Sequence, residues 1–453
     1  MNPYTDLGVL DFLLLPFLLA LVYGFAYSYR NRHYRDGHPW RPYFIPALSV
    51  KIFGAIFIGL IYAYYYKGGD TFNYFNHSQV INSALDESFS KWLNLVLRIP
   101  SPSDGEYYQY ISKMDFYRNP GTYIISAITA VLSLLTFETY LPTAVLFAII
   151  SFTGVWALFR TFAKLHPQFV RIVAVSILFI PSVIIWGSGI FKDTICIMSL
   201  GWLTYCTYSL IIDKDYSIQN IITATLSLYL LVNIKVYIII AYAPAVLFWL
   251  LSLFSNKFRN EHVKRVVVVF FTLGTISSTF QIFDNYSNFF DKYSLENIDE
   301  TSRITRNYIS YKSQVDDGSG YTLSKVEQSI LGKMLQFPEA VNVTLFRPYF
   351  WEAKKSIVLL SAIESFLFLL ITLKVILAIG IKRIVKTISN DYTIQFCLIF
   401  SIIFSYAVGI STYNFGALSR YKIPGLSFYL LVILLIWYKN QPQHKKIIRI
   451  LNI

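Results

Sequence analysis

The first candidate for a reactive residue in this sequence is an aspartate that follows two glycines. The segment YYYKGGDTFNYF places Asp70 directly after Gly68 and Gly69, a few residues beyond a long apolar run. Glycines permit a tight backbone turn, and a carboxylate there can take a proton from a hydroxyl or help to hold a divalent cation. A solvated loop aspartate is the alternative interpretation.

Basic and acidic residues gather again in KMDFYRNP, just before another apolar run. Lys113, Asp115 and Arg118 stand there among aromatic residues. Arginine binds phosphate by paired hydrogen bonds and lysine binds it as a point charge. Anchoring at a membrane interface needs the same residue types, so both roles stay open.

Three further turns between apolar runs carry charge. In WGSGIFKD, Lys192 and Asp193 can neutralise other groups, although a carboxylate in the first turn of a helix is also favoured by the helix dipole. Late in the chain, FRPYFWEAKK and STYNFGALSRYKIPG contribute a set that neighbouring helices can bring together with the earlier loops around one cavity: Arg347, Glu352, Asn414, Arg420 and Lys422. Glu364 is an acid inside an apolar run, where pairing or a proton path are the two options.

The composition indicates that most of this protein lies in a lipid bilayer. Apolar residues make up 55% of the 453 residues, charged residues only 14%, and the mean hydropathy is high. The net charge of +13 is carried by short clusters between apolar runs, which is typical of topology signals in membrane proteins. We therefore exclude nucleic acid as a partner. The three cysteines lie in apolar stretches without a CxxC pair, so we expect neither a disulfide nor a structural zinc.

The elements that must position the charged turns are membrane spans. The sequence predicts an all-α polytopic protein, a single transmembrane domain over residues 1–453 with about eleven transmembrane helices and further interfacial helices in external loops. Candidate spans lie near residues 10–29, 45–66, 141–160, 172–189, 191–212, 218–234, 237–255, 265–283, 356–381, 392–411 and 423–438.

The orientation of the spans follows from the basic clusters, which stay in the cytoplasm. The arginines after the first span place the N-terminus outside. If residues 121–137 crossed the membrane, the later basic clusters would all lie outside. We therefore predict an interfacial or re-entrant helix there. Two large external loops result, 67–140 and 284–355. Ser324 and Glu327 form a capping-box pattern, which predicts an amphipathic helix in the second.

Taken in order, these motifs resemble a known family. An outward aspartate, a basic and aromatic stretch before a short apolar helix, the P-S-x-x-x-W-x-S-G-x-x-K-D turn and the late G-x-x-x-R-Y-K-x-P turn resemble bacterial polytopic glycosyltransferases of the GT-C type and the related O-antigen-like polysaccharide polymerases. The resemblance implies a multi-pass protein of the bacterial cytoplasmic membrane that makes cell-surface polysaccharide or glycolipid. Its partners would be membrane lipids, a polyprenyl-(di)phosphate sugar donor and a glycan or lipid acceptor.

Carried over to this chain, the family pattern matches Asp70 as the acid that activates the acceptor and Lys113 and Arg118 as contacts of the lipid phosphate. The second carboxylate often found beside the first is absent, since Thr71 follows Asp70. A flippase or other transporter of lipid-linked glycans is the main alternative, with large external loops and few charges inside the spans against it. A membrane acyltransferase ranks last because His77, His166 and His262 have no partner in a recognisable motif.

Overall fold

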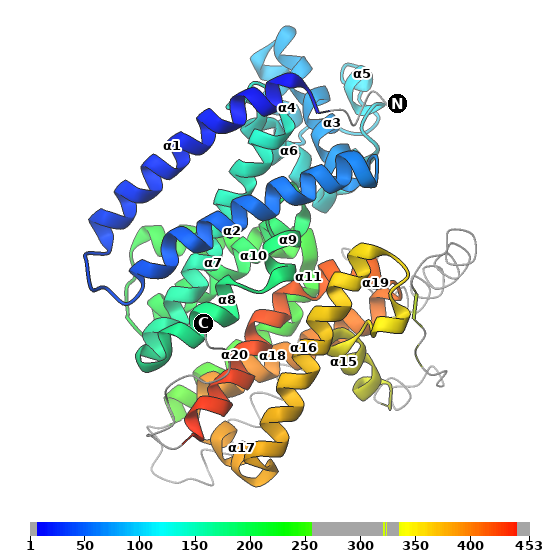
Figure 1. Cartoon of the computed structure of the whole chain (residues 1–453). Coiled ribbons are helices and arrows are strands. Elements are labelled where there is room, and N and C mark those ends of the chain that lie inside the picture. Colours follow the sequence, from blue (N-terminus) through cyan, green and yellow to red (C-terminus); the bar gives the residue numbers. More distant parts are fainter. Residues whose placement is uncertain (1–6, 256–319, 322, 324–334, 442–453) are drawn as a thin grey trace. The chain divides into compact units, whose positions relative to one another are not determined.

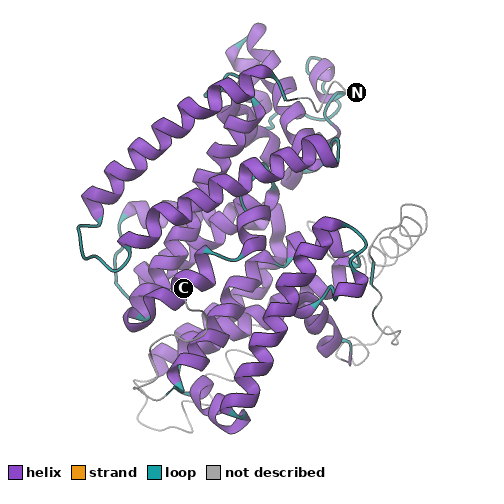
Figure 2. Cartoon of the chain, in the orientation of Figure 1, coloured by secondary structure: helices purple, strands orange, loops and turns teal. Residues whose placement is uncertain are grey.

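The computed structural model describes residues 7–255, 320–321, 323 and 335–441. These residues are helical throughout, apart from turns and one isolated bridge between Gly320 and Asn414 (Figures 1 and 2). The chain divides into two compact units, Met1–Val236 and Tyr237–Ile453. Each unit is described below by itself.

Among the described residues, seven helices are long and apolar enough to cross a membrane. An eighth span results if α19 (Phe415–Tyr421) and α20 (Ile423–Lys439), which meet at an angle of 64°, form one broken span. The seven are Val9–His33 (α1), Arg41–Tyr65 (α2 with η1), Tyr140–Leu165 (α7), Lys192–Ile211 (α10), Ile218–Leu253 (in α11), Ser356–Ile379 (α16) and Tyr392–Thr412 (α18). The all-α multi-pass character is confirmed, whereas the count of about eleven is not.

The difference in count has local causes. Residues 172–189 form two short helices, α8 (Val170–Leu178) and α9 (Pro181–Trp186), because the ring of Pro181 cannot continue the hydrogen-bond ladder. The two spans predicted at 218–234 and 237–255 count as one helix, α11 (Ile218–Ser255), which has a kink at Lys235, between the two predicted spans. The predicted span at 265–283 lies outside the described residues.

In the first unit α7 is the central helix, and α10 runs parallel to it at close range. Gly154 and Gly201 make that possible: a Cβ on either would lie 2.2 Å or 2.0 Å from a backbone oxygen of the other helix. Trp202 Nε1 donates to Thr153 Oγ1, and Lys164 pairs with Asp213 near the far ends of the two helices. These pairs fix the register of α10 on α7.

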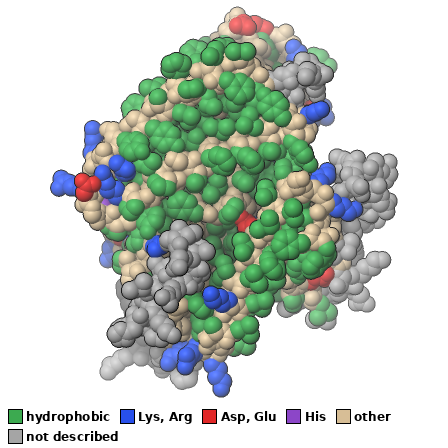
Figure 3. All heavy atoms as spheres, in the orientation of Figure 1, with side chains coloured by type: hydrophobic (Ala, Val, Ile, Leu, Met, Phe, Trp, Pro, Cys, Tyr) green, Lys and Arg blue, Asp and Glu red, His purple; other side chains and the backbone are tan. Residues whose placement is uncertain are grey.

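The two ends of the first unit differ in charge. At one end, Leu141 N donates to Asp11 of α1, and the same start of α7 packs on Gly59 near the end of α2. The basic residues of the α1–α2 turn and of the end of α7 lie at the other end, where Trp156 donates to Tyr34. Figure 3 shows Lys and Arg around the α1–α2 turn, beyond a broad apolar surface. This distribution favours the predicted orientation.

Between α2 and α7 the chain folds into a small helical subdomain with its own core. It comprises α3 (Asp70–Asn82), η2 (Ser83–Asp86), α4 (Phe89–Val96), α5 (Tyr108–Ile111), η3 (Asp115–Arg118) and α6 (Pro120–Leu134). Trp92, Leu95, Tyr117 and Tyr123 belong to one buried cluster that joins α4, η3 and α6. The loop predicted at 67–140 is thus a folded structure.

The short helix α6 crosses α7 instead of running along it. Thr122 near its start bonds Lys192 at the start of α10, and Thr136 just past its end bonds Thr143 of α7. By the register of α7 and α10, these two points differ by no more than about 8 Å along α7, whereas a helix of this length measures about 22 Å. The arrangement favours the interfacial or re-entrant position predicted for residues 121–137.

The second unit is built around α18. Gly409 lets α18 approach α15 (Phe337–Phe346) closely, since a Cβ there would lie 2.3 Å from the carbonyl oxygen of Ala340. Phe400 of α18 packs against Phe404 and Phe428, the latter on α20. The short η5 (Phe350–Glu352) precedes α16, and α17 (Ile381–Ser389) links α16 to α18.

Candidate functional site

Asp70 is the first residue of α3, and two glycines position it. Gly68 and Gly69 have φ angles of 132° and 121°, which L side chains rarely adopt. A Cβ on Gly69 would also lie 2.8 Å from the ring of Tyr62. The chain therefore turns sharply against Tyr62, and the exposed carboxylate of Asp70 is placed at the start of a helix, where the dipole favours negative charge.

One face of α3 lies against the basic stretch of η3. Tyr74 and His77 follow Asp70 at helical spacing and pack on the ring of Phe116, with centroid distances of 5.4 and 4.9 Å. Burial lowers the pKa of His77, and the negative charge of Asp115 partly offsets the shift. The imidazole is therefore neutral at neutral pH. Lys113, Asp115 and Arg118 are exposed on this side.

The starts of α6 and α10 meet next to that face. Asn119 caps α6 by accepting a hydrogen bond from Thr122 N at 3.1 Å. The side chain of Thr122 in turn accepts a bond of 2.5 Å from Lys192 Nζ. Phe191, the residue before Lys192, packs on the ring of Tyr62. Gly69 lies against the same ring. Asp70 and Lys192 are thus placed by the same tyrosine.

Asp193, the neighbour of Lys192, points into the protein and not toward a ligand. Its carboxylate pairs with the ammonium group of Lys235, and the two side chains are only 1% and 5% exposed. Lys235 reaches it because α11 is broken at that residue, with φ −148° and ψ 76°. Gly121 packs on the carbonyl of Asn233 just before the break. The ion pair holds α10, α11 and the start of α6 together.

Lys51 is a second buried cation that sequence reasoning missed. It lies in the middle of α2 and is 1% exposed. Its ammonium group donates to Gly187 O at 2.8 Å, Val183 O at 3.0 Å and Ser151 Oγ at 3.1 Å. Two of these acceptors are carbonyls at the end of α9: that of Gly187 lies just past the helix, and that of Val183 also accepts a hydrogen bond from Gly187 N at 3.2 Å. A lysine within an apolar run was the available signal.

In the second unit, Arg347 and Glu352 form an ion pair with several hydrogen bonds. The guanidinium Nε lies 3.1 Å from both carboxylate oxygens, and Nη2 also donates to Oε1. Tyr349 N donates to the same carboxylate at 2.8 Å. The rings of Tyr321, Tyr349 and Phe415 surround the guanidinium at 5.3 to 5.7 Å.

Lys422 ties this group to the junction of α19 and α20. Its ammonium group donates to Ser365 Oγ at 2.7 Å and to Arg347 O at 3.2 Å, and it is almost completely buried. Glu364, the predicted intramembrane acid, is also buried and acts electrostatically on Lys422. Asn414 caps α19, and Arg420 lies in the last turn of the same helix. Arg347, Glu352 and Lys422 lie together within the second unit, whereas the predicted convergence of these residues with the earlier loops stays a prediction.

The predicted site residues therefore fall into two groups. One gathers around the starts of α3, α6 and α10 in the first unit, and the other around Arg347 in the second. No set of three or more metal-ligating side chains occurs in the described part of the chain, and Cys196, Cys206 and Cys397 are free and buried. The amphipathic helix predicted after Ser324 lies outside the described residues. No protein-family model, curated protein or solved structure matches the chain.

Proposed function

We propose that this protein is a membrane glycosyltransferase that uses a polyprenyl-phosphate or polyprenyl-diphosphate sugar on the extracytoplasmic face of the bacterial cytoplasmic membrane. The observation that carries the proposal is the convergence of Asp70, the basic stretch of η3 and Lys192 around one set of helix starts. A carboxylate and several cations are thereby held at the end of the first unit away from its basic cytoplasmic turns.

The charges suit the chemistry of sugar transfer from a lipid phosphate. In that reaction an acceptor hydroxyl oxygen bonds to the anomeric carbon while the bond from that carbon to the phosphate oxygen breaks. The phosphate leaves with the electron pair, and the hydroxyl proton must go to a base. Lys192, Lys113 and Arg118 are the groups that would stabilise the leaving phosphate, and the Asp70 carboxylate would accept the proton.

The starts of α6 and α10 add to the positive potential for the phosphate. Unpaired N–H groups at a helix start, together with the helix dipole, favour bound anions. Lys192 stands at the first position of α10, and Asn119 with Pro120 begins α6. Asp193 stays outside the reaction, because its charge is already matched by Lys235.

Asp70 is the residue on which this proposal is tested. Reconstituted protein carrying Asp70→Asn should insert normally but lose transfer from a panel of radiolabelled polyprenyl-linked sugars, because an amide cannot take the proton. Asp104→Asn, a half-buried acid of the same subdomain, is the matched control and should keep full activity. Full activity of Asp70→Asn would remove Asp70 from the mechanism.

A transporter of lipid-linked glycans is the second candidate, and the buried Lys51 and Lys235 are the observation that bears on it. Transport pathways place charged groups at membrane depth. Here, however, Lys51 donates to three protein acceptors and Lys235 has a carboxylate partner. The same reconstitution separates the two functions, since a transporter would move the labelled lipid across the bilayer without forming a glycosidic bond.

A further inference from the structure

Helix α4 has three distinct faces, whereas a surface helix of a soluble domain usually has two. Its first face is buried: Trp92 and Leu95 enter the core of the subdomain. Trp92 Nε1 donates to Asn82, and Tyr123 OH on α6 donates to the carbonyl of Leu95 at 2.7 Å. This face attaches α4 firmly to α3 and α6.

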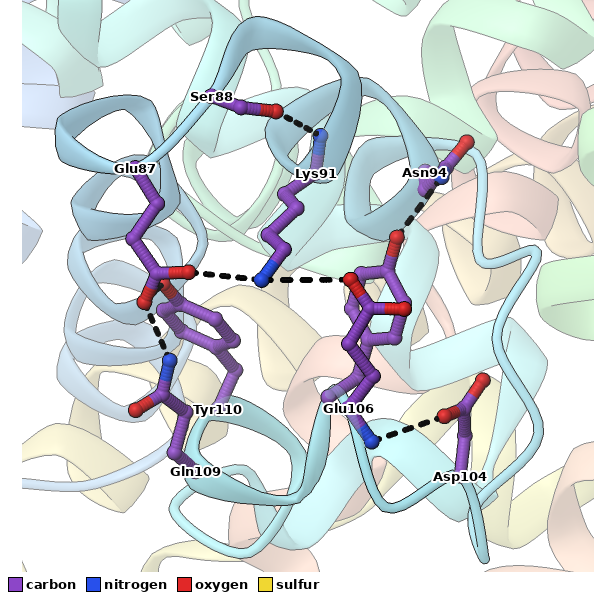
Figure 4. Close-up of polar contacts among 9 residues, drawn as sticks. Glu87, Ser88, Lys91, Asn94, Asp104, Glu106, Gln109 and Tyr110 are labelled. Carbon is purple, nitrogen blue, oxygen red and sulfur yellow. Dashed lines mark hydrogen bonds and ion pairs between the residues drawn. The ribbon is translucent and has the colours of Figure 1, made fainter.

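The second face is polar and is covered by the segment around α5. Lys91 lies between Glu87 and Glu106, at 2.8 and 3.3 Å, and Asn94 donates to the hydroxyl of Tyr107 (Figure 4). Gln109 and Tyr110 also donate to Glu87. The side chains of Lys91 and Asn94 thus have hydrogen-bond partners within the subdomain.

The third face is apolar, and the described part of the chain leaves it exposed. Phe89, Leu93 and Leu97 follow one another at intervals of four residues, and their exposed fractions are 64%, 37% and 60%. Leu85 and Ile99 extend the stripe beyond both ends of the helix, with 37% and 65% exposed. These five residues are called the α4 stripe below. Such a contiguous apolar surface marks an interaction site.

The surroundings of the stripe point to lipid. α4 lies alongside α6, because Trp92 is linked through Asn82 to Ser133 while Leu95 bonds Tyr123. The end of α6 and the turn after it expose more apolar side chains, at Leu134, Leu135 and Phe137, directly before the span α7. The subdomain begins equally close to a span, after the exposed Tyr64, Tyr65 and Tyr66 at the end of α2.

We propose that the α4 stripe docks on the outer leaflet of the bilayer, so that the subdomain of residues 70–134 is seated in the membrane interface and not held in water above it. Aromatic residues at both of its ends suit the interfacial region, and an apolar face of this kind inserts shallowly into the boundary of head groups and acyl chains. The proposal depends on the membrane topology but not on the glycosyl-transfer chemistry.

Fluorescence quenching tests this docking. Phe89→Cys, Leu93→Cys and Leu97→Cys would each be labelled with an environment-sensitive dye in nanodiscs of phosphatidylcholine and phosphatidylglycerol. The exposed faces tolerate the substitutions, and the native cysteines are buried. Ser103→Cys, in the polar loop of the same subdomain, is the control. Doxyl-labelled lipid should reduce the emission at positions 89, 93 and 97 by roughly half and leave position 103 unchanged.

Two results would overturn the proposal. If aqueous iodide quenched positions 89, 93 and 97 as strongly as position 103, the stripe would face water. If neither quencher reached them while Phe89→Cys formed cross-links between chains, a second copy of the protein would cover the stripe. Transfer activity is not part of the readout, so the result stands whether or not the proposed chemistry is correct.

Discussion

Both units contain a cluster of charged groups at a break in a helix, but the two clusters handle their charge differently. In the first unit the break in α11 presents Lys235, which a carboxylate from α10 neutralises, and the adjacent Lys192 stays partly exposed. In the second unit the junction of α19 and α20 presents Lys422, which is held by a backbone carbonyl and a hydroxyl. There the arginine is already matched by Glu352 and ringed by aromatic side chains.

This difference indicates which cluster is available to a ligand. The first unit keeps an internal ion pair that fixes three helices and sets a further lysine beside the helix starts. In the second unit the three charged groups that converge are directed at one another or at the protein backbone. We infer that the cluster around Lys192 acts on substrate and that the cluster around Lys422 holds its helices in place.

Breaking the buried ion pair should have the largest effect on stability. Asp193→Asn leaves the ammonium group of Lys235 buried without a counter-charge, which costs about 3–5 kcal/mol. Thermal unfolding in nanodiscs should show a large fall in Tm. The double variant Asp193→Leu with Lys235→Met is the control, and it should recover most of the loss because it removes both charges. An unchanged Tm for Asp193→Asn would contradict the structural role of the pair.

Lys192 should matter for activity more than for stability. Lys192→Met removes the proposed charge-assisted contact to the phosphate. Such a contact is worth about 1.5–3 kcal/mol, which corresponds to a roughly 10- to 150-fold lower kcat/KM. Thr122→Val removes the hydrogen-bond acceptor of Lys192 but keeps the charge, so its effect should be clearly smaller. Equal losses in the two variants would mean that Lys192 only braces α6.

Lys422 is expected to behave in the opposite way. Lys422→Met removes two hydrogen bonds from a buried site and should cost about 1–3 kcal/mol in unfolding free energy. Transfer kinetics, measured at a temperature where the variant is folded, should keep the wild-type kcat/KM. Ser365→Ala, which removes one of the two acceptors, should show a smaller fall in Tm. A loss of activity without a loss of stability would place Lys422 at the substrate instead.

Long apolar runs predicted the helices well, because such a run has no stable alternative to a helix in a membrane. Val9–His33 and Tyr392–Thr412 match their predicted spans closely. The breaks were predicted unevenly. The predicted spans 218–234 and 237–255 leave a gap between them, and α11 is broken in that gap, at Lys235, whereas 172–189 was predicted as one span although Pro181 gave a visible signal for its division.

The candidate site was predicted in its members but not in its pairings. Asp70 stood out because glycines precede it, and their positive φ angles explain that signal. Nothing local to Thr122 indicated that it would meet Lys192, since that contact depends on how α6 crosses α7. The partners of Lys51 were hidden for the same reason: they are mostly backbone carbonyls, which every residue has.

The smallest effect is expected at an exposed ion pair, that of Glu87, just before α4, with Lys91 of α4. Hydrogen bonds from Lys91 and Tyr110 lower the pKa of Glu87 from 4.5 to about 2. A lowered pKa in the folded state stabilises the protein above pH 4.5, and this contribution is lost as the pH falls from 4.5 toward 2. Glu87→Gln should therefore flatten the acid limb of the Tm profile slightly and leave Tm near neutral pH almost unchanged. A fall in Tm as large as that of Asp193→Asn would contradict the expectation that the exposed ion pair contributes less to stability than the buried one.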